Sequence, residues 1–172
     1  MISVPSEIYS AEYYATINDG GMLFNECVGK VIPRRMNECI KLSNIQSTDV
    51  VLDFGCGRGD IVFYLHNKCK QVIGIDYSIS AINICNVTKD KYDASANNIS
   101  FNLSTITDMT LVDNSIDKIF LLDVVEHLHP PELDCLLNKL YKALKVGGTI
   151  IIHTAPNLNF YHYGYPIIRF LY

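Results

Sequence analysis

Short apolar runs alternate with amphipathic stretches along this chain, and the two kinds of segment have different periods. Short runs rich in β-branched residues are typical of buried strands, and they lie at residues 50–54, 71–75, 99–103, 118–122 and 149–153. Between these runs, apolar residues recur at spacings of three and four, as they do on one face of a helix. The pattern therefore predicts five strands that alternate with helices.

Proline, glycine and serine mark the expected helix boundaries. Pro33 and Pro130 can each open a helix, Ser78 or Ser80 can cap one, and another follows the glycines at 55–59. We expect Gly147-Gly148 to end the helix that begins at Pro130. The apolar stripe of that helix is Leu133, Leu136, Leu137, Leu140, Tyr141 and Leu144. The helix after the glycines carries Ile61, Val62, Leu65 and Cys69 on one face.

Strands that alternate with helices predict an α/β fold, a doubly wound and mainly parallel sheet with helices on both faces. Such sheets bind ligands beyond the carboxyl ends of their strands. Asp53, Asp76, Asp123 and His153 all lie at expected strand ends. We therefore expect these four side chains to gather at one edge and to mark a binding site.

Composition narrows the class of protein. The chain has 172 residues, the size of one domain, and its 49% hydrophobic and 19% charged residues are typical of a soluble globular protein. A net charge of −4 without any block of lysine or arginine gives no electrostatic footprint for nucleic acid. The six cysteines form no C-x-x-C pair, and the first residues lack the basic and apolar regions of a signal peptide, so we expect none. No apolar run approaches the length that would span a membrane. We expect a cytoplasmic protein that binds neither a membrane nor a structural metal.

The most informative motif is the turn after the first expected strand. Residues 53–59 read D-x-G-x-G-x-G, in which glycines let the backbone turn sharply and admit a ligand close to the main chain. This spacing differs from the G-x-G-x-x-G of a dinucleotide site, which disfavours an NAD-dependent oxidoreductase.

The turn and the segments after it resemble class I S-adenosylmethionine (SAM)-dependent methyltransferases over about residues 33–157. The matching stretches are residues 50–60, 73–78, 113–128 and 147–152. The resemblance implies a Rossmann-like sheet of order 3-2-1-4-5 in a single domain. Residues 1–32 are rich in tyrosine and glycine, and we expect them to form an irregular or helical cap on a core at 33–157, with a C-terminal tail at 158–172.

The same resemblance assigns the cofactor-binding residues. It places Gly55, Cys56 and Gly57 against the methionine part of SAM, Asp53 at its amino group, and Asp76 on both ribose hydroxyls. Tyr77 borders the adenine. Thr105 and Ile106 contact the adenine, and Leu122 and Asp123 complete the site. The family often has an acid where this chain has Ser104 or Thr105, and Asp108 is the other candidate for that role.

Catalysis is predicted at Glu126 and His127, which the resemblance places beside the methyl group. His127 is a candidate general base. The spacing Asp123-x-x-Glu126-His127 also resembles a divalent-metal cluster of some O-methyltransferases, and the plain alternative is that the pair caps a loop. The simplest interpretation of His129 and His153 is that both have a structural role.

The C-terminal end departs from the family, whose members usually have two more strands after the fifth. We expect an incomplete C-terminal part, an aromatic tail, and a strand at 149–153 whose open edge favours self-association. The function predicted from these features is methyl transfer from SAM to a small-molecule acceptor. The alternative is a non-catalytic SAM-binding or interaction module.

Overall fold

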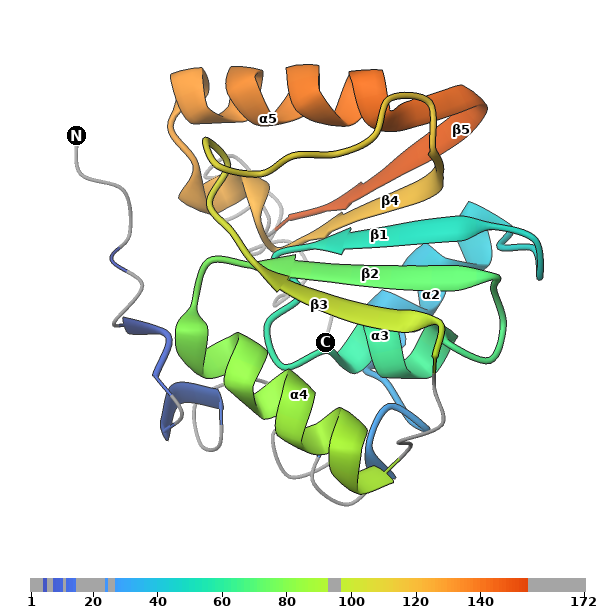
Figure 1. Ribbon diagram of the computed structural model, residues 1–172, viewed down its shortest axis with the longest axis vertical. Coiled ribbons are helices and arrows are strands. Elements are labelled where there is room, and N and C mark those ends of the chain that lie inside the picture. The colour runs from blue at the N-terminus through green and yellow to red at the C-terminus, as the bar shows by residue number, and fades with distance from the viewer. Residues whose placement is uncertain are drawn as a thin grey trace, which may run out of the picture.

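The computed structural model describes residues 5, 8–10, 12–14, 24, 27–92 and 97–154. The elements are α2 (Arg34–Ser43), β1 (Val50–Phe54), α3 (Asp60–Leu65), β2 (Gln71–Asp76), α4 (Ile79–Tyr92), β3 (Ile99–Leu103), β4 (Ile116–Leu122), the short 3₁₀ helix η3 (Val125–His127), α5 (Pro130–Ala143) and β5 (Leu144–His153). All strand pairs are parallel and the sheet order is β3-β2-β1-β4-β5, which confirms the predicted fold class (Figure 1).

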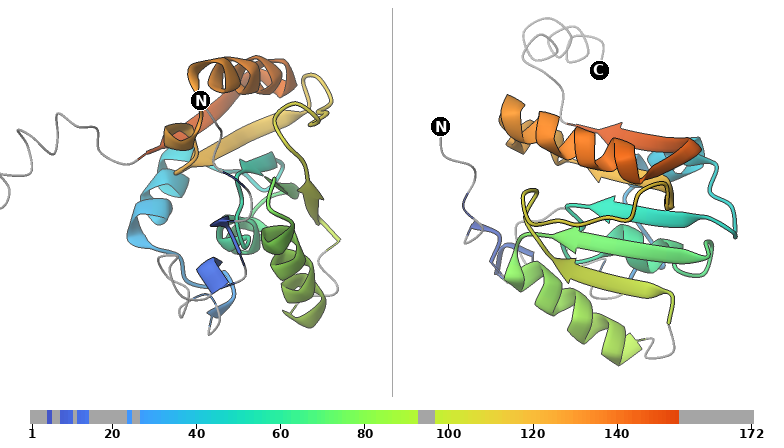
Figure 2. Two further views of the ribbon diagram at one scale, coloured as in Figure 1. Left: turned by 90° about the vertical axis from the view of Figure 1, so that its left-hand side faces the viewer. Right: turned by 45° about the horizontal axis from the view of Figure 1, so that its top comes forward.

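Helices cover both faces of the sheet, with α5 on one face and α3 and α4 on the other (Figures 1 and 2). Successive β1 residues point to opposite faces, so Val51 packs in the core beneath α2, α3 and α4. Leu52 packs in the second core, beneath Leu136 and Leu140 of α5. Both faces of the central strands are thus buried, which explains why β1 and β4 consist mostly of apolar residues.

The predicted boundaries hold closely for the first three strands and less well elsewhere. Ser78 is the residue that caps α4, because its hydroxyl accepts a hydrogen bond from the Ala81 amide at 3.3 Å. β4 begins at Ile116, two residues earlier than expected. Cys69 lies beyond the end of α3, although it is still buried in the core.

The end of α5 differs from the sequence-based expectation. The helix stops at Ala143, and β5 begins at once with Leu144, so Gly147-Gly148 lie inside a strand rather than at a helix end. The amides of Asn114 and Ser115 donate to the last helical carbonyls, each at 2.8 Å, and thereby end the helix without a glycine.

The predicted apolar stripe of α5 also needs a correction at two positions, because Leu144 belongs to β5 and Tyr141 faces solvent. Tyr141 is 78% exposed, whereas Leu136, Leu140 and Ala143 are buried. The buried stripe therefore runs along a narrower face than expected, and its last member is a small residue that lets the helix sit close to the sheet.

The cap at 1–32 and the tail at 158–172 fall largely or wholly outside the described residues. Within the described part of the cap, Tyr14, Phe24 and Ile32 are buried against the main domain. No helix in the described ranges is both long and apolar enough to cross a membrane.

Candidate active site

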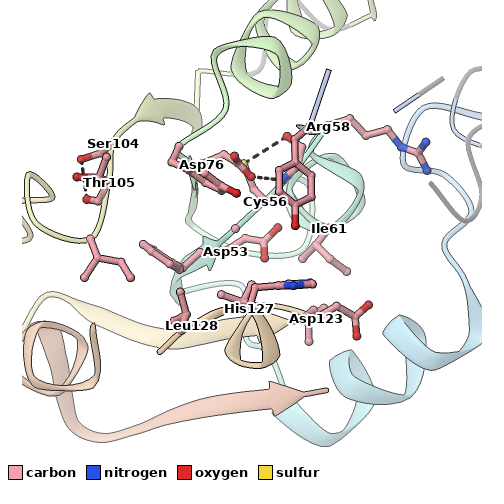
Figure 3. A pocket seen from close by; sticks show the side chains of 18 of the residues that line it. Asp53, Cys56, Arg58, Ile61, Asp76, Ser104, Thr105, Asp123, His127 and Leu128 are labelled. Atoms are coloured by element: carbon pink, nitrogen blue, oxygen red, sulfur yellow. Dashed lines mark hydrogen bonds between the residues drawn. The ribbon is translucent and has the colours of Figure 1, made fainter. Parts of the chain in front are cut away.

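A cavity of about 820 Å³ lies at the carboxyl ends of the strands, where the topology predicts a ligand site (Figure 3). Every residue predicted to bind the cofactor lines it: Asp53, Gly55, Cys56, Gly57, Asp76, Tyr77, Thr105, Ile106, Leu122 and Asp123. His127 lines it as well. Glu126 is not among the lining residues, and its carboxylate accepts a hydrogen bond from the Thr154 hydroxyl at 3.0 Å.

The turn after β1 owes its shape to glycines with positive φ. Gly55 has φ +76°, and a Cβ there would lie 2.5 Å from Cγ2 of Val124, in the loop after β4. The amides of Gly55 and Cys56 both donate to the Ile75 carbonyl, at 2.7 and 3.0 Å. The glycine at 55 is therefore required by close contact between two loops of the protein, in addition to any ligand.

Cys56 lines the cavity, but its side chain is buried. Its hydrogen bond with Cys85 and its burial raise the pKa of the Cys56 thiol well above the usual range. The side chain approaches β2, since a Cβ at Gly74 would lie 2.9 Å from the Cys56 sulfur. The thiol is thus a core group and not a nucleophile.

Asp76 is held firmly at the end of β2. Oδ2 accepts a hydrogen bond from the Gly57 amide, and Oδ1 accepts one from the Ser78 amide, both at 2.8 Å. Burial raises the pKa of Asp76, and these amides oppose the shift. Each carboxylate oxygen can accept more than one hydrogen bond, so both can also accept hydroxyl groups of a ligand.

Asp53 is the most deeply buried acid of the cavity, with 3% exposure. Burial first, and then repulsion from Asp60 and Asp76, raises the pKa of Asp53 to about 8. The carboxyl group is therefore mainly protonated at neutral pH. A cationic ligand group beside it would favour the ionised form.

Thr105 and Asp108 lie together at one side of the cavity. The Thr105 hydroxyl donates to Oδ2 of Asp108 at 2.6 Å, and the Asp108 amide donates back to that hydroxyl at 3.3 Å. Both residues line the cavity. The sequence left open whether Thr105 or Asp108 contacts the adenine. Both can meet a ligand in the cavity, and the Asp108 carboxylate is the stronger hydrogen-bond acceptor.

Asp123, at the end of β4, binds neighbouring elements with its carboxylate. Arg35 of α2 donates to Oδ2, and the Nδ1 atom of His153 lies 2.7 Å from Oδ1. The residue has φ +58°, a left-handed conformation that turns the chain from β4 toward η3. The same turn brings His127 to the cavity, where its ring meets that of Tyr9 edge to face at 6.4 Å.

Several lining residues were missed by sequence reasoning, namely Tyr9, Tyr13, Tyr14, Arg35 and Arg58. Tyr9 and Tyr14 lie near the N-terminus, and only the tyrosine content of residues 1–32 gave any signal of their role. Arg58 lies inside the glycine motif itself.

The lining of the cavity is acidic. Besides the mainly protonated Asp53, its ionisable groups include the carboxylates of Asp60, Asp76, Asp108, Asp123 and Glu132 and the guanidiniums of Arg35 and Arg58. Among the described residues, no three or more His, Cys, Asp and Glu side chains are placed to hold a metal ion. The arrangement is suited to a ligand that carries hydroxyl and cationic groups, both of which carboxylates bind.

Comparison with known proteins identifies the family. A family model described as a methyltransferase domain matches residues 45–159. Phosphoethanolamine N-methyltransferase 1 of Arabidopsis thaliana is 30% identical over 116 residues, which cover 67% of this chain and 23% of that protein. Sterol 24-C-methyltransferase of Saccharomyces cerevisiae is 26% identical over 160 residues, covering 88% of this chain and 39% of that protein.

Solved structures agree on the fold. Phosphoethanolamine N-methyltransferase 1 of Haemonchus contortus, in complex with phosphoethanolamine and S-adenosylhomocysteine, superposes with a TM-score of 0.69 at 17% identity. The match covers 87% of this chain and 31% of that one. This chain thus spans well under half the length of these relatives. It belongs to the methyltransferase domain family, which confirms the SAM-dependent, Rossmann-like assignment made from its motifs.

Proposed function

We propose that this chain binds SAM in the cavity at the carboxyl ends of β1, β2 and β4 and transfers its methyl group to a small-molecule acceptor. One observation carries the proposal. The glycine turn, the buried carboxyls Asp53 and Asp76, and His127 come from three different strand ends and line the same cavity.

The residues present fit this cofactor. Asp76 offers two fixed oxygens, and vicinal ribose hydroxyls match that spacing. Asp53 offers a buried carboxyl whose ionised form a cationic amino group would stabilise. When bound, SAM supplies a methyl group already activated by its sulfonium. The protein's own task is therefore to align the acceptor and to exclude water.

His127 is the residue best placed to act on the acceptor. It is an exposed side chain that lines the cavity, at the end of η3 and beyond the strand that ends at Leu122. An imidazole there can accept a proton from an acceptor hydroxyl or ammonium group. Glu126 does not line the cavity, so we leave it out of the proposed chemistry.

The acidic lining of the cavity favours a methyl acceptor that is neutral or basic. Carboxylates outnumber guanidiniums among its lining residues, which disfavours an anionic group near the methyl donor. We therefore favour a small neutral or basic acceptor. The relatives named as phosphoethanolamine N-methyltransferases agree with an amine as the methyl-accepting group, although phosphoethanolamine also carries an anionic phosphate. A relative from Gallus gallus is named as a tRNA methyltransferase.

Two measurements test the proposal. Calorimetric titration with SAM, S-adenosylhomocysteine and NAD should show binding of the first two and none of the third; tight NAD binding would instead support the oxidoreductase alternative. Transfer of a labelled methyl group to a panel of small amines, alcohols and acids should then show turnover with neutral or basic acceptors. Binding without turnover on any acceptor would favour the non-catalytic module.

A further inference from the structure

Arg58 is a buried cation in the middle of the cofactor turn. Its side chain is 3% exposed, although arginine is mostly found at the surface. A buried charge is stable only when it is paired and hydrogen-bonded. The contacts of Arg58 therefore indicate what the residue is for.

The guanidinium binds Asp60, the first residue of α3, with two hydrogen bonds. Nε donates to Oδ2 at 2.9 Å, and Nη2 donates to Oδ1 at 3.3 Å. Burial raises the pKa of Asp60 and the Arg58 charge opposes that shift. This paired geometry fixes the plane of the guanidinium and leaves its other nitrogen in a defined direction.

That other nitrogen reaches the N-terminal part of the chain. Nη1 donates to the backbone carbonyl of Tyr14 at 2.9 Å, and the guanidinium carbon lies 5.0 Å from the centre of the Phe24 ring. Arg58 thus contacts the chain on both sides of residues 15–23. Figure 3 shows its guanidinium directed away from Asp53 and Asp76, so it points toward the N-terminal part and not toward the centre of the cavity.

The N-terminal residues that Arg58 holds form one wall of the cavity. We call residues 8–10 and 12–14 the tyrosine segment, and its Tyr9, Tyr13 and Tyr14 all line the cavity. Tyr14 is 5% exposed, and Cε1 of its ring lies 3.3 Å from where a Cβ of Gly57 would be. The ring therefore lies directly on the turn that is proposed to hold the cofactor.

The other end of the tyrosine segment is fixed to a second cofactor loop. The Ser78 hydroxyl donates to the Tyr9 carbonyl at 2.9 Å, and the Tyr9 ring packs edge to face on Tyr77 at 5.8 Å. The segment is thus attached to the loops after β1 and β2, and Arg58 supplies the charged attachment. A ligand between those loops lies beneath this wall.

We propose that Arg58 is a positioning residue that holds the tyrosine segment over the cofactor turn and thereby slows release of the cofactor. The inference rests on the proposed function, because it takes the ligand of the cavity to be SAM or S-adenosylhomocysteine. Arg58 touches no reacting atom in this proposal and acts through Tyr14.

The test measures the rate at which labelled S-adenosylhomocysteine leaves the full chain. Arg58→Met should speed release about tenfold to a hundredfold, as expected for loss of a hydrogen bond to a charged group. Arg58→Lys keeps a charge beside Asp60 but lacks the planar fork. Arg58→Lys should therefore recover most of the thermal stability that Arg58→Met loses, while S-adenosylhomocysteine is still released faster than from the wild-type chain. Arg34→Met, which removes an exposed guanidinium of α2, should release at the wild-type rate.

A double-mutant cycle separates positioning from a general loss of structure. If Arg58 acts through the tyrosine segment, Tyr14→Ala and Arg58→Lys should each speed release, and the double variant should release little faster than either. Additive effects, or wild-type release from both Arg58 variants, would overturn the inference alone. A wild-type chain that does not bind S-adenosylhomocysteine would overturn the proposed function as well.

Discussion

Replacement of Asp76 by alanine is the sharpest test of the cofactor site. The structure predicts two separate effects, because the carboxylate accepts hydrogen bonds from the Gly57 and Ser78 amides and also faces the cavity. Two ribose hydroxyls would lose their charged acceptor, which should weaken S-adenosylhomocysteine binding by about 2–3 kcal/mol, or roughly 30- to 150-fold.

The same change should also lower the free energy of unfolding of the ligand-free protein. Each buried amide left without an acceptor costs about 1–3 kcal/mol, and the Ser78 amide is the more deeply buried of the two. The loss should remain within the total stability of a domain of this size, about 5–15 kcal/mol, so the variant should fold.

Isothermal titration and thermal unfolding without ligand measure the two effects independently. Asp76→Asn serves as the matched variant, since it keeps one oxygen for an amide while losing the charge, and it should bind weakly with a smaller loss of stability. Asp113→Ala, which removes an exposed carboxylate outside the cavity, should change neither quantity. Wild-type affinity in a folded Asp76→Ala protein would falsify the assignment of the ribose site.

Four further outcomes are expected. His127→Ala should lower the methyl-transfer rate while the affinity for S-adenosylhomocysteine stays nearly unchanged; an unchanged rate would leave the residue with a structural role. The folded-state pKa of Asp53, about 8, lies above its ordinary value, so the native state keeps a proton that the unfolded state loses. The free energy of unfolding should therefore fall between about pH 4 and pH 8, and Asp53→Asn should flatten the fall; an equal slope in the variant would contradict this origin. Gly55→Ala places a Cβ 2.5 Å from Val124 at a positive φ and should cost about 2–4 kcal/mol, whereas Gly147→Ala, with φ +82° and open space, should cost about 1–2 kcal/mol by chemical denaturation; equal costs would remove the role of the Val124 contact. Finally, among the described strands β5 pairs only with β4 and Ile152 is 50% exposed, so light scattering over a dilution series should show self-association, and a strictly monomeric chain at every concentration would count against the predicted open edge.

Local pattern accounts for most of the fold. The predicted strands at 50–54 and 99–103 match β1 and β3 residue for residue. β1 lies inside the sheet and is buried along almost its whole length, whereas β3 lies at the edge of the sheet and alternates apolar with polar residues. The motif residues line the cavity because parallel strands place their carboxyl ends at one edge. The end of α5 was not predictable in this way, since the amides that end it come from the loop before β4.

The sequence by itself therefore determined the alternation of strands and helices, the strand order that the motifs implied, and the set of residues at the carboxyl edge. Only the tertiary structure decided which partner each polar side chain binds and how deeply it is buried. It showed that the Asp123 carboxylate is bound by Arg35 and His153, and that Arg58 is buried beneath Tyr14. The physical reason is that strand pattern depends on neighbours in sequence, whereas the pairing and burial of a charge depend on side chains from distant parts of the chain.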